Sequence, residues 1–449
     1  MIQTLDLRGR SLSTADLLAL VPRSASDVGS AVAVVDALIA DVRERGSAAL
    51  LEQAERFDRV RPPQLRVPAE ALAEAAARLD PAVRDALDEA ITRVRRGTAG
   101  QVPPPVTTEV APGARIVQRW MPVARVGLYV PGGKAVYPSS VVMNVVAAQV
   151  AGVRSIALAS PAQQAFGGSV HPTILAAAHL LGVDEVYAMG GAGAIGALAH
   201  GVPDLGLEPV QVITGPGNLF VATAKRAVTG VVGIDSEAGP TEILVIADRT
   251  ANPAYVVADL VSQAEHDELA GSVLVTDDAE LARAVAQLLP AAVAAAHHRE
   301  RITTSFAGPQ SAIVLVDDLE QAVAFSNAYA PEHLEVQVAD PEALLPALEN
   351  AGAIFVGDHT PVSLGDYVAG SNHVLPTGGA ARYSSGLGAY TFLRPQQIIE
   401  YDRAALSVVA DQVSALSAAE QLPAHGRAVQ VRFEPAADGA PAAGSGTDG

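Results

Sequence analysis

Hydrophobic and polar residues follow periods that change from segment to segment along the chain. A helical period appears first over residues 26–58, with a turn at Gly46. An Asp-Pro pair begins a second helix over residues 80–96, because proline is favoured in the first turn of a helix. The segment 97–113 is rich in proline, glycine and threonine and predicts a loop, and residues 115–130 contain two strand-like runs.

Strand-like and helical runs then alternate in two series. The first series predicts strands at 123–130, 155–159, 185–189, 210–214 and 231–235, with helices at 141–151, 171–181, 194–200 and 219–228. The second predicts strands at 242–247, 272–276, 312–316, 334–338 and 353–356, with helices at 253–265, 279–295, 319–329 and 341–348. Such alternation is typical of βαβ units and parallel sheets. We therefore expect an α/β fold with two Rossmann-like, incomplete α/β domains and small helical extensions at both ends.

Composition narrows the classes of function. The chain has 449 residues, enough for two or more domains, and its 49% hydrophobic and 4% aromatic content fits a soluble, helix-rich α/β protein. The net charge of −19 argues against nucleic acid or an anionic membrane as the partner. The absence of cysteine excludes disulfides, thiolate metal ligands and a catalytic thiol.

Two segments bear on location and order. The N-terminal residues show no basic region followed by an apolar one, which predicts no signal peptide and a cytoplasmic protein. Residues 135–153 are uncharged but contain Pro138, Asn144 and Gln149, which favours a packed helix over a membrane span.

A carboxylate and an imidazole stand side by side at Glu332 and His333. Pro331 disfavours helix at Ala330, so the pair is expected where a loop enters the strand 334–338. Neighbours on an extended chain point to opposite sides, so both serve one site only if the backbone there is irregular or the site wraps around it. A surface glutamate and a half-buried histidine would give the same pattern.

Other polar groups in the second half of the chain could bind a metal. Gln263 and His266 share a helical face at i and i+3, where they are either a pair of ligands or a polar helix end. Asp366 and His373 lie in a segment braced by glycines, which is either a functional loop or a solvated one.

A further glutamate and histidine, Glu420 and His425, flank a proline after a helix, where a solvated turn is the alternative. The second half thus holds four candidate histidines, each near an acid or amide: His266, His333, His373 and His425. Zinc prefers nitrogen ligands with some carboxylate oxygen, so a site assembled from these segments would suit zinc.

Glycine loops follow several predicted strands. Residues 191–196 formally match the dinucleotide fingerprint, but the confirming acid further along the chain is missing. Residues 215–218 lead into a helix whose N-terminal amides could meet a phosphate, and residues 130–133 end another strand the same way. These loops are consistent with a nucleotide site, although each is also an ordinary turn.

Motifs spread over the chain resemble the histidinol dehydrogenase family from about residue 5 to 432. In order they are Val126-Gly-Leu-Tyr-Val-Pro-Gly-Gly133, Gly215-Pro-Gly-Asn218, Ala238-Gly-Pro-Thr-Glu242, Ser262-Gln-Ala-Glu-His-Asp267, Ala330-Pro-Glu-His-Leu334, Gly365-Asp-Tyr367 and Asn372-His-Val-Leu-Pro-Thr377. The resemblance implies oxidation of L-histidinol to L-histidine, the last step of histidine biosynthesis. It also implies the use of two NAD, one zinc per subunit, and a homodimer.

The resemblance assigns roles to individual positions. It implies zinc ligands at Gln263, His266, Asp366 and His425 and an acid–base pair at Glu332 and His333. Substrate contacts match Thr241, Gln263, His266, His333, Asp366, His373, Glu420 and His425, and NAD contacts match Tyr129, Gly193 and Asn218. The segment with Glu420 and His425 is expected to reach into the partner's site.

Two positions depart from the family's pattern. Position 193 is usually glutamine and is glycine here, so a side-chain contact to NAD is missing. Thr241 replaces the commoner serine and keeps the hydroxyl.

These observations predict a division of the chain into segments. We expect an N-terminal extension at 1–25 and a first α/β domain, with the zinc and catalytic residues, at 26–128 and 241–387. A second α/β domain with the NAD-side loops is expected at 129–240. A dimer-crossing segment at 388–433 and a disordered tail at 434–449 follow.

Converting an alcohol to an acid removes four electrons through an aldehyde. It needs a base for the alcohol proton and, without cysteine, a base-activated water that adds to the aldehyde. His333 suits the first role and Glu332 the second. Two other hypotheses compete with this one, and the first of them uses the same His, Asp and Glu residues. One is a zinc hydrolase, against which the nucleotide loops count. The other is a two-domain binding protein, which would not need an acid–base pair beside a metal.

Overall fold

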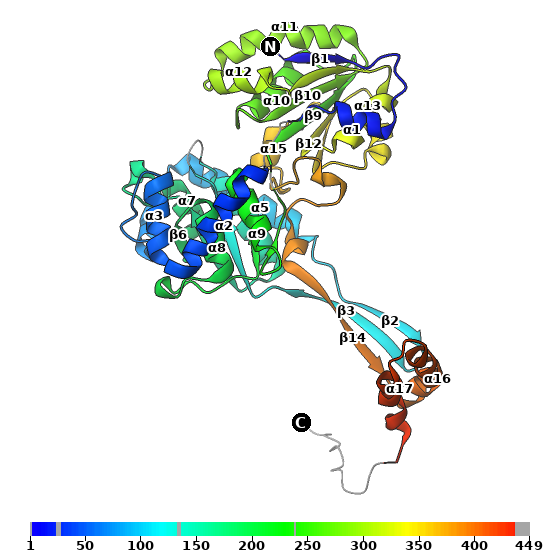
Figure 1. Ribbon diagram of the computed structural model, residues 1–449. Coiled ribbons are helices and arrows are strands. Elements are labelled where there is room, and N and C mark those ends of the chain that lie inside the picture. The colour runs from blue at the N-terminus through cyan, green and yellow to red at the C-terminus, as the bar shows by residue number, and fades with distance from the viewer. Residues whose placement is uncertain (1, 24–27, 133–135, 238, 436–449) are drawn as a thin grey trace. The chain divides into compact units, whose positions relative to one another are not determined.

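The computed structural model describes residues 2–23, 28–132, 136–237 and 239–435. The chain divides into two compact units, a larger one of residues 1–102 and 122–393 and a smaller one of residues 103–121 and 394–449. The larger unit holds a five-stranded and a six-stranded sheet, and both are parallel (Figure 1). The expected α/β fold class, with parallel sheets, is confirmed.

The five-stranded sheet has the order β6-β5-β4-β7-β8. Its strands are β4 (Arg125–Tyr129), β5 (Ser155–Ser160), β6 (Val186–Ala188), β7 (Val212–Thr214) and β8 (Gly233–Ile234). One face packs on α2 (Val28–Arg45), α3 (Ser47–Phe57), α8 (Gly191–His200) and α9 (Leu219–Val228). The remaining helices of this region are α4 (Ala69–Ala77), α5 (Pro81–Ala99), α6 (Pro138–Ala151) and α7 (Pro172–Leu180), which pack on one another.

The six-stranded sheet has the order β1-β11-β10-β9-β12-β13. Its strands are β1 (Gln3–Asp6), β9 (Glu242–Ala247), β10 (Gly271–Thr276), β11 (Ala312–Leu315), β12 (His333–Gln337) and β13 (Ala353–Val356). One face packs on α1 (Thr14–Leu20), α13 (Leu319–Tyr329) and α14 (Pro341–Leu344). The other packs on α10 (Pro253–Ala264), α11 (Ala279–Ala295), α12 (Arg299–Ala307) and α15 (Val362–Tyr367).

The smaller unit contains a three-stranded sheet of β14 (Leu393–Tyr401), β3 (Ala114–Pro122) and β2 (Val106–Ala111), in which β2 and β3 are antiparallel. It continues into α16 (Arg403–Ala419) and α17 (Pro423–Gln430). The predicted loop at 97–113 is therefore wrong where β2 forms. Every residue of β2 is exposed, so its sequence lacks the alternation of apolar and polar residues that marks a half-buried strand.

The packing of the N-terminal half differs from the expected grouping of residues 26–128 with 241–387. Val35 and Ile39 of α2 belong to the core of the five-stranded sheet, and β4 pairs with β5 and β7. The expected N-terminal extension contains β1, which pairs with β11. Apolar periodicity marks that these elements are buried but not against which sheet, so only the tertiary contacts could assign them.

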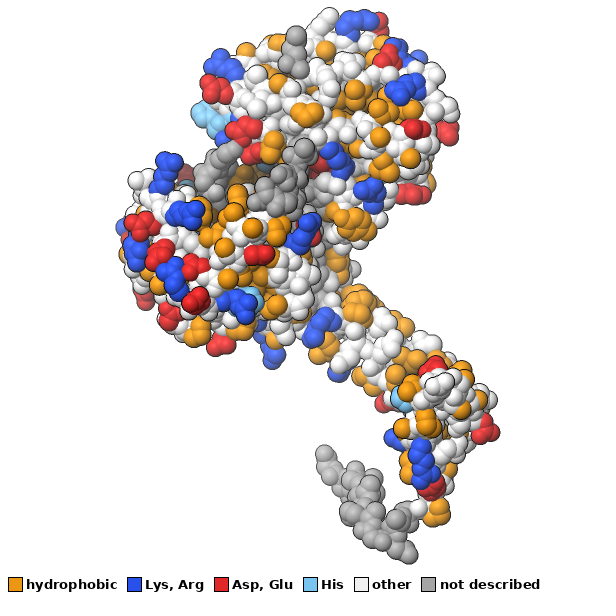
Figure 2. All heavy atoms as spheres, in the orientation of Figure 1, with side chains coloured by type: hydrophobic (Ala, Val, Ile, Leu, Met, Phe, Trp, Pro, Cys, Tyr) orange, Lys and Arg blue, Asp and Glu red, His pale blue; other side chains and the backbone are white. Residues whose placement is uncertain are grey.

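The sequence also led us to expect no membrane span and a packed helix in the uncharged segment 135–153. Within the described ranges, no helix has both the length and the apolar character needed to span a membrane. The uncharged segment forms α6, most of whose residues are buried. On the face shown in Figure 2, basic and acidic side chains are intermixed on the surface around α2 and α3. The expected tail at 434–449 lies mostly outside the described residues.

Candidate active site

A large pocket of about 2020 Å³ in the larger unit collects most of the predicted site residues. At the five-stranded sheet it is lined by residues that follow the carboxyl ends of strands, such as Pro131 and Pro216. At the six-stranded sheet it is lined by Thr241, Glu332 and His333, which lie at the amino ends of β9 and β12. The rule that ligands bind beyond carboxyl ends therefore applies to the five-stranded sheet alone.

The backbone just before β12 is irregular. Ala330 ends α13 in the left-handed region, with φ 48° and ψ 67°, and Pro331 follows it. Glu332 precedes the strand and His333 is its first residue. Both side chains are buried and both line the pocket, so the irregular entry lets two neighbours serve one site.

The carboxyl group of Glu332 is held by two donors. Its Oε2 accepts hydrogen bonds from Thr241 Oγ1 at 2.5 Å and from the Glu242 backbone N–H at 2.9 Å. Both bonds favour the charged form, but burial dominates and raises the pKa of Glu332 to about 7. Thr241 Oγ1 also accepts from Gln263 Nε2 at 2.6 Å, so the retained hydroxyl connects the acid to the expected metal site.

The imidazole of His333 is fixed in one tautomer. Its Nδ1 lies 3.0 Å from the carbonyl oxygen of Glu242, which can only accept, so Nδ1 carries the proton. Burial lowers the pKa of His333. The ring is thus neutral at pH 7 with its lone pair on Nε2, which is the state that a general base requires.

Three of the four expected zinc ligands lie in the larger unit, on α10, the turn after it and α15. Because Gln263 Nε2 donates to Thr241, its Oε1 is directed elsewhere, and that oxygen is buried without a hydrogen-bond partner. His266 Nε2 lies 4.0 Å from Asp366 Oδ2, and two atoms bound to one zinc are roughly 3–4 Å apart. An amide oxygen, an imidazole and a carboxylate fit zinc chemically, and the unpaired Gln263 oxygen could coordinate a cation.

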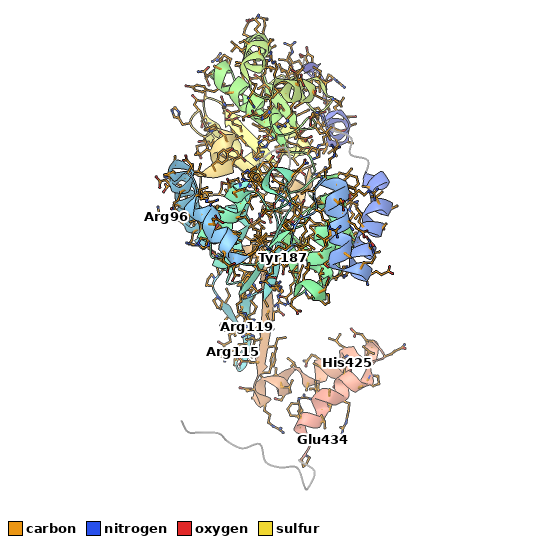
Figure 3. All side chains as sticks on the ribbon, turned by 90° about the vertical axis from the view of Figure 1, so that its left-hand side faces the viewer. Arg96, Arg115, Arg119, Tyr187, His425 and Glu434 are labelled. Atoms are coloured by element: carbon orange, nitrogen blue, oxygen red, sulfur yellow. The ribbon has the colours of Figure 1, made fainter. Side chains whose placement is uncertain are left out.

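Gln263, His266 and Asp366 do not complete a metal site by themselves. Among residues 2–23, 28–132, 136–237 and 239–435, no three His, Cys, Asp or Glu side chains are grouped closely enough to hold a metal ion. His266 and Asp366 are the two of those types in the expected set within the larger unit. The fourth expected ligand, His425, lies on α17 of the smaller unit (Figure 3). Glu420, at the end of α16, belongs to the same unit, and both side chains are exposed.

His373, expected to contact the substrate, lines the pocket with both ring nitrogens engaged. Nδ1 lies 2.9 Å from the carbonyl oxygen of Asp366, and Nε2 lies 3.1 Å from Ser140 Oγ. It therefore connects the end of α15 to α6. Ser140 carried no signal in the sequence, since it looks like any other residue of a buried helix.

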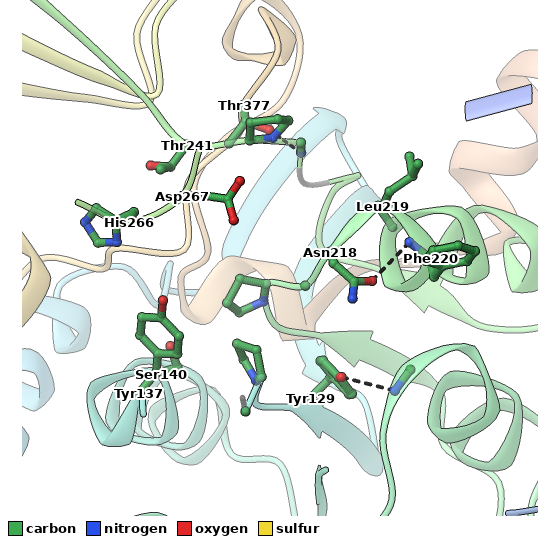
Figure 4. Close-up of a pocket in the computed structure, with 18 of the residues that line it drawn as sticks. Tyr129, Tyr137, Ser140, Asn218, Leu219, Phe220, Thr241, His266, Asp267 and Thr377 are labelled. Carbon is green, nitrogen blue, oxygen red and sulfur yellow. Dashed lines mark hydrogen bonds between the residues drawn. The ribbon is translucent and has the colours of Figure 1, made fainter. Parts of the chain in front are cut away.

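Two of the three expected NAD-contacting residues line the same pocket, which Figure 4 shows with Thr241 and His266. Tyr129 accepts a hydrogen bond on its hydroxyl from the Gly191 N–H at 3.2 Å, and burial raises its pKa to about 12, so it stays neutral. Asn218 caps α9 by accepting from the N–H groups of Phe220 and Val221.

Gly193, the third expected NAD-contacting residue, is not among the residues that line the pocket. It is buried in α8, and a Cβ atom there would collide with Oε1 of Gln53. Gln53 itself lines the pocket and donates from Nε2 to the Leu38 carbonyl at 3.1 Å. The glycine thus leaves room for an amide side chain that comes from α3.

The loop at Gly215 is clamped by a buried ion pair that the sequence did not reveal. Lys225 and Asp235 contact each other with side chains 1% and 4% exposed. Lys225 Nζ donates to the Gly215 carbonyl at 3.1 Å, and Asp235 Oδ2 accepts from the Gly215 N–H at 2.8 Å. Gly215 has φ +118°, and a Cβ there would collide with the Tyr129 carbonyl, so only glycine fits.

Glu242 is a further buried acid beside the site. Its Oε2 accepts from the Gly378 N–H at 3.2 Å, and burial raises its pKa to about 7. Arg23 stands 4.0 Å away and lowers that pKa in part. In the sequence Glu242 is the first residue of a predicted strand, and nothing local distinguishes it from a solvated glutamate.

Parallel sheets with glycine loops at one side of a pocket and a buried acid–base pair at the other define an α/β enzyme.

The model of the histidinol dehydrogenase family matches residues 21–433. The chain is 66% identical over 433 residues to histidinol dehydrogenase of Leifsonia xyli subsp. xyli, covering 96% of this chain and 99% of that one. It is 60% identical to that of Thermobifida fusca, covering 96% and 98%. The crystal structure of histidinol dehydrogenase from Elizabethkingia anophelis matches with a TM-score of 0.89 at 31% identity, covering 96% and 98%. The chain belongs to the histidinol dehydrogenase family and is an oxidoreductase.

Proposed function

We propose that the protein oxidises L-histidinol to L-histidine in two NAD-dependent steps, the last step of histidine biosynthesis, with one zinc per subunit and an active site shared between two subunits. Family membership supports histidinol as the substrate. The observation that carries the proposal is one pocket lined by a neutral base, His333, together with His266 and Asp366. Gln263, which donates to Thr241 of the same pocket, adds a buried amide oxygen without a hydrogen-bond partner.

The acid–base steps follow from the two buried side chains. His333 Nε2 accepts the proton of the substrate's alcohol, because its Nδ1 proton is held by the Glu242 carbonyl. Glu332, with a pKa of about 7, populates both protonation states near neutrality and can take a proton from the water that adds to the aldehyde. Its two donors fix the plane of the carboxyl group, so it acts from one orientation.

The remaining residues bind and orient. Gln263 Oε1, His266 and Asp366 would hold zinc from this chain, with His425 of a second copy completing the set. Zinc, when bound, supplies positive charge that positions and polarises the substrate. NAD, when bound, supplies the acceptor for hydride, and Tyr129 and Asn218 would contact it. His373 would contribute to substrate binding through the wall that it forms with Ser140, and Glu420 would do so from the second copy.

Exposed apolar side chains on the smaller unit support association with a second copy. Ile399 is 64% exposed, Val408 72% and Leu416 65%, and some apolar surface of this unit is visible in Figure 2. Such residues are usually covered in a stable assembly. A homodimer would cover them and would bring a second chain's His425 within reach of a site that lacks a fourth ligand.

The reaction is tested with the purified protein, L-histidinol and NAD. We expect two equivalents of reduced cofactor, read by absorbance, for each histidinol consumed, and about one zinc per chain by metal analysis. No reduced cofactor would refute the dehydrogenase proposal, and hydrolysis of ester or amide substrates without cofactor would favour a zinc hydrolase.

Sharing of the site is tested by complementation. A His333→Asn chain and a His425→Ala chain, carrying different tags, are co-expressed and the mixed dimer is purified. If His425 acts in the partner's site, the mixed dimer has one intact site and about half the wild-type activity. An inactive mixed dimer would show that each chain uses its own His425.

A further inference from the structure

The face of β12 that begins with His333 carries polar side chains that never reach solvent. His333, Glu335 and Gln337 alternate along the strand and are 4%, 1% and 1% exposed. Leu334 and Val336 point to the opposite face, into the core against α13. A strand with this alternation would ordinarily expose its polar face, so the burial needs a reason.

Glu335 is paired with a second acid. Its carboxyl group is hydrogen-bonded to that of Asp259 on α10, which is 6% exposed. Gln337 Nε2 donates to Glu335 Oε1 at 2.9 Å, while no other group in the described part of the chain donates to the buried Oε2. Two carboxylates cannot hydrogen-bond to each other, so one of them must carry a proton.

The backbone N–H of Val362, the first residue of α15, lies beside Asp259 and lowers its pKa in part. The pair therefore connects three elements, and each of them carries part of the proposed active site. Gln263 is one helical turn beyond Asp259 on α10, His333 is the next residue on the Glu335 face of β12, and Asp366 lies on α15. Neither acid lines the pocket.

We propose that Asp259 and Glu335 form a positioning pair, sharing one proton, that holds α10, β12 and α15 in the arrangement that the proposed metal ligands and the base require. The catalytic part of this inference rests on the function proposed above. The pair does not touch the substrate, and it acts through the elements it joins.

The electrostatics of the pair agree with the hydrogen bonds. Burial raises the pKa of both acids and brings that of Glu335 to about 9, with Asp259 adding to the effect. Asp358, in the turn after β13, is also an acid and raises the pKa of Glu335 further. Glu335 is then the proton donor and Asp259 the acceptor at pH 7.

The test compares two substitutions at one position. Glu335→Gln keeps the shape, because the amide oxygen can accept from Gln337 and the amide N–H can donate to Asp259. Glu335→Leu removes both bonds and leaves Asp259 buried with one donor. We expect the leucine variant to lose about 10- to 100-fold in kcat for histidinol oxidation, since small displacements of reacting groups have effects of this size. The glutamine variant should stay within about twofold of wild type at pH 7.

A control separates positioning from lost stability. Val336→Ala opens a cavity on the opposite face of the same strand and should lower the melting temperature without lowering kcat below that temperature. A folded leucine variant with wild-type kcat would overturn the positioning role. If the Val336→Ala variant loses kcat in proportion to its melting temperature, the effect is one of stability and the proposal also fails.

The shared proton is tested by the pH dependence of the melting temperature. A carboxyl pKa raised on folding favours the folded state less as pH rises from about 4.5 to about 9. The melting temperature of wild type should therefore fall relative to Glu335→Gln across that window, whatever reaction the enzyme catalyses. A constant difference would overturn the shared proton. Inactive wild-type enzyme would instead refute the proposed function and leave this measurement interpretable.

Discussion

The buried ion pair of Lys225 and Asp235 offers a strong test of how the loop at Gly215 is held. Lys225→Met keeps the aliphatic part of the side chain. It leaves the Asp235 carboxylate, whose side chain is 4% exposed, without a cation beside it. It also removes the donor to the Gly215 carbonyl.

Removing one partner of a buried pair destabilises a protein by about 3–5 kcal/mol. We expect a loss of this size in the free energy of unfolding, measured with urea and circular dichroism, and about a tenfold rise in the KM for NAD.

Two matched variants make this prediction refutable. Lys225→Met with Asp235→Asn removes the lone charge and keeps an acceptor for the Gly215 N–H. The buried carbonyl of Gly215 then stays unpaired, which costs about 1–3 kcal/mol. The double variant should therefore be more stable than the single one. Arg226→Met breaks the neighbouring ion pair of Arg226 and Glu237, whose side chains are 54% and 44% exposed. It should change the free energy of unfolding by at most about 1 kcal/mol. If Lys225→Met is no less stable than Arg226→Met, the clamp does not hold the loop.

Three further outcomes follow from the site. His333→Asn should lower kcat by about 10²- to 10⁴-fold while zinc, by metal analysis, stays near one per chain, and loss of zinc would refute its role as base. Burial raises the pKa of Glu332 from 4.5 to about 7, so the folded protein binds the extra proton between these values and loses stability as pH rises through them. Glu332→Gln cannot bind this proton, so wild type should lose about 3 kcal/mol of unfolding free energy relative to it between pH 4 and pH 8, measured with urea. A difference that does not change with pH would contradict the burial argument. Gly193→Gln should lower the melting temperature because it collides with Gln53, and adding Gln53→Gly should restore it; no restoration would place the strain elsewhere.

The order of strands and helices was largely readable from the sequence. Apolar runs that alternate with helical segments predicted every strand of the two parallel sheets except β1, since a strand buried on both faces is apolar throughout. Asp80 before Pro81 marked the start of α5, where the Asp80 carboxylate accepts from the first N–H groups of the helix. The exposed strand β2 was missed, and α2 was grouped with the other sheet. Exposure removes the local signal, and sheet membership depends on contacts between residues far apart in the chain.

For the site, the sequence determined which side chains are available and, through Pro331, that the chain turns just before His333. It also excluded a catalytic thiol. Only the tertiary structure decided what those side chains can do. The proton on His333 Nδ1 depends on a carbonyl from β9, and the raised pKa of Glu332 depends on its burial. The pairing of Asp259 with Glu335 depends on a helix and a strand that are far apart in the chain. Protonation states follow from burial and from partners, and neither is a property of the local sequence.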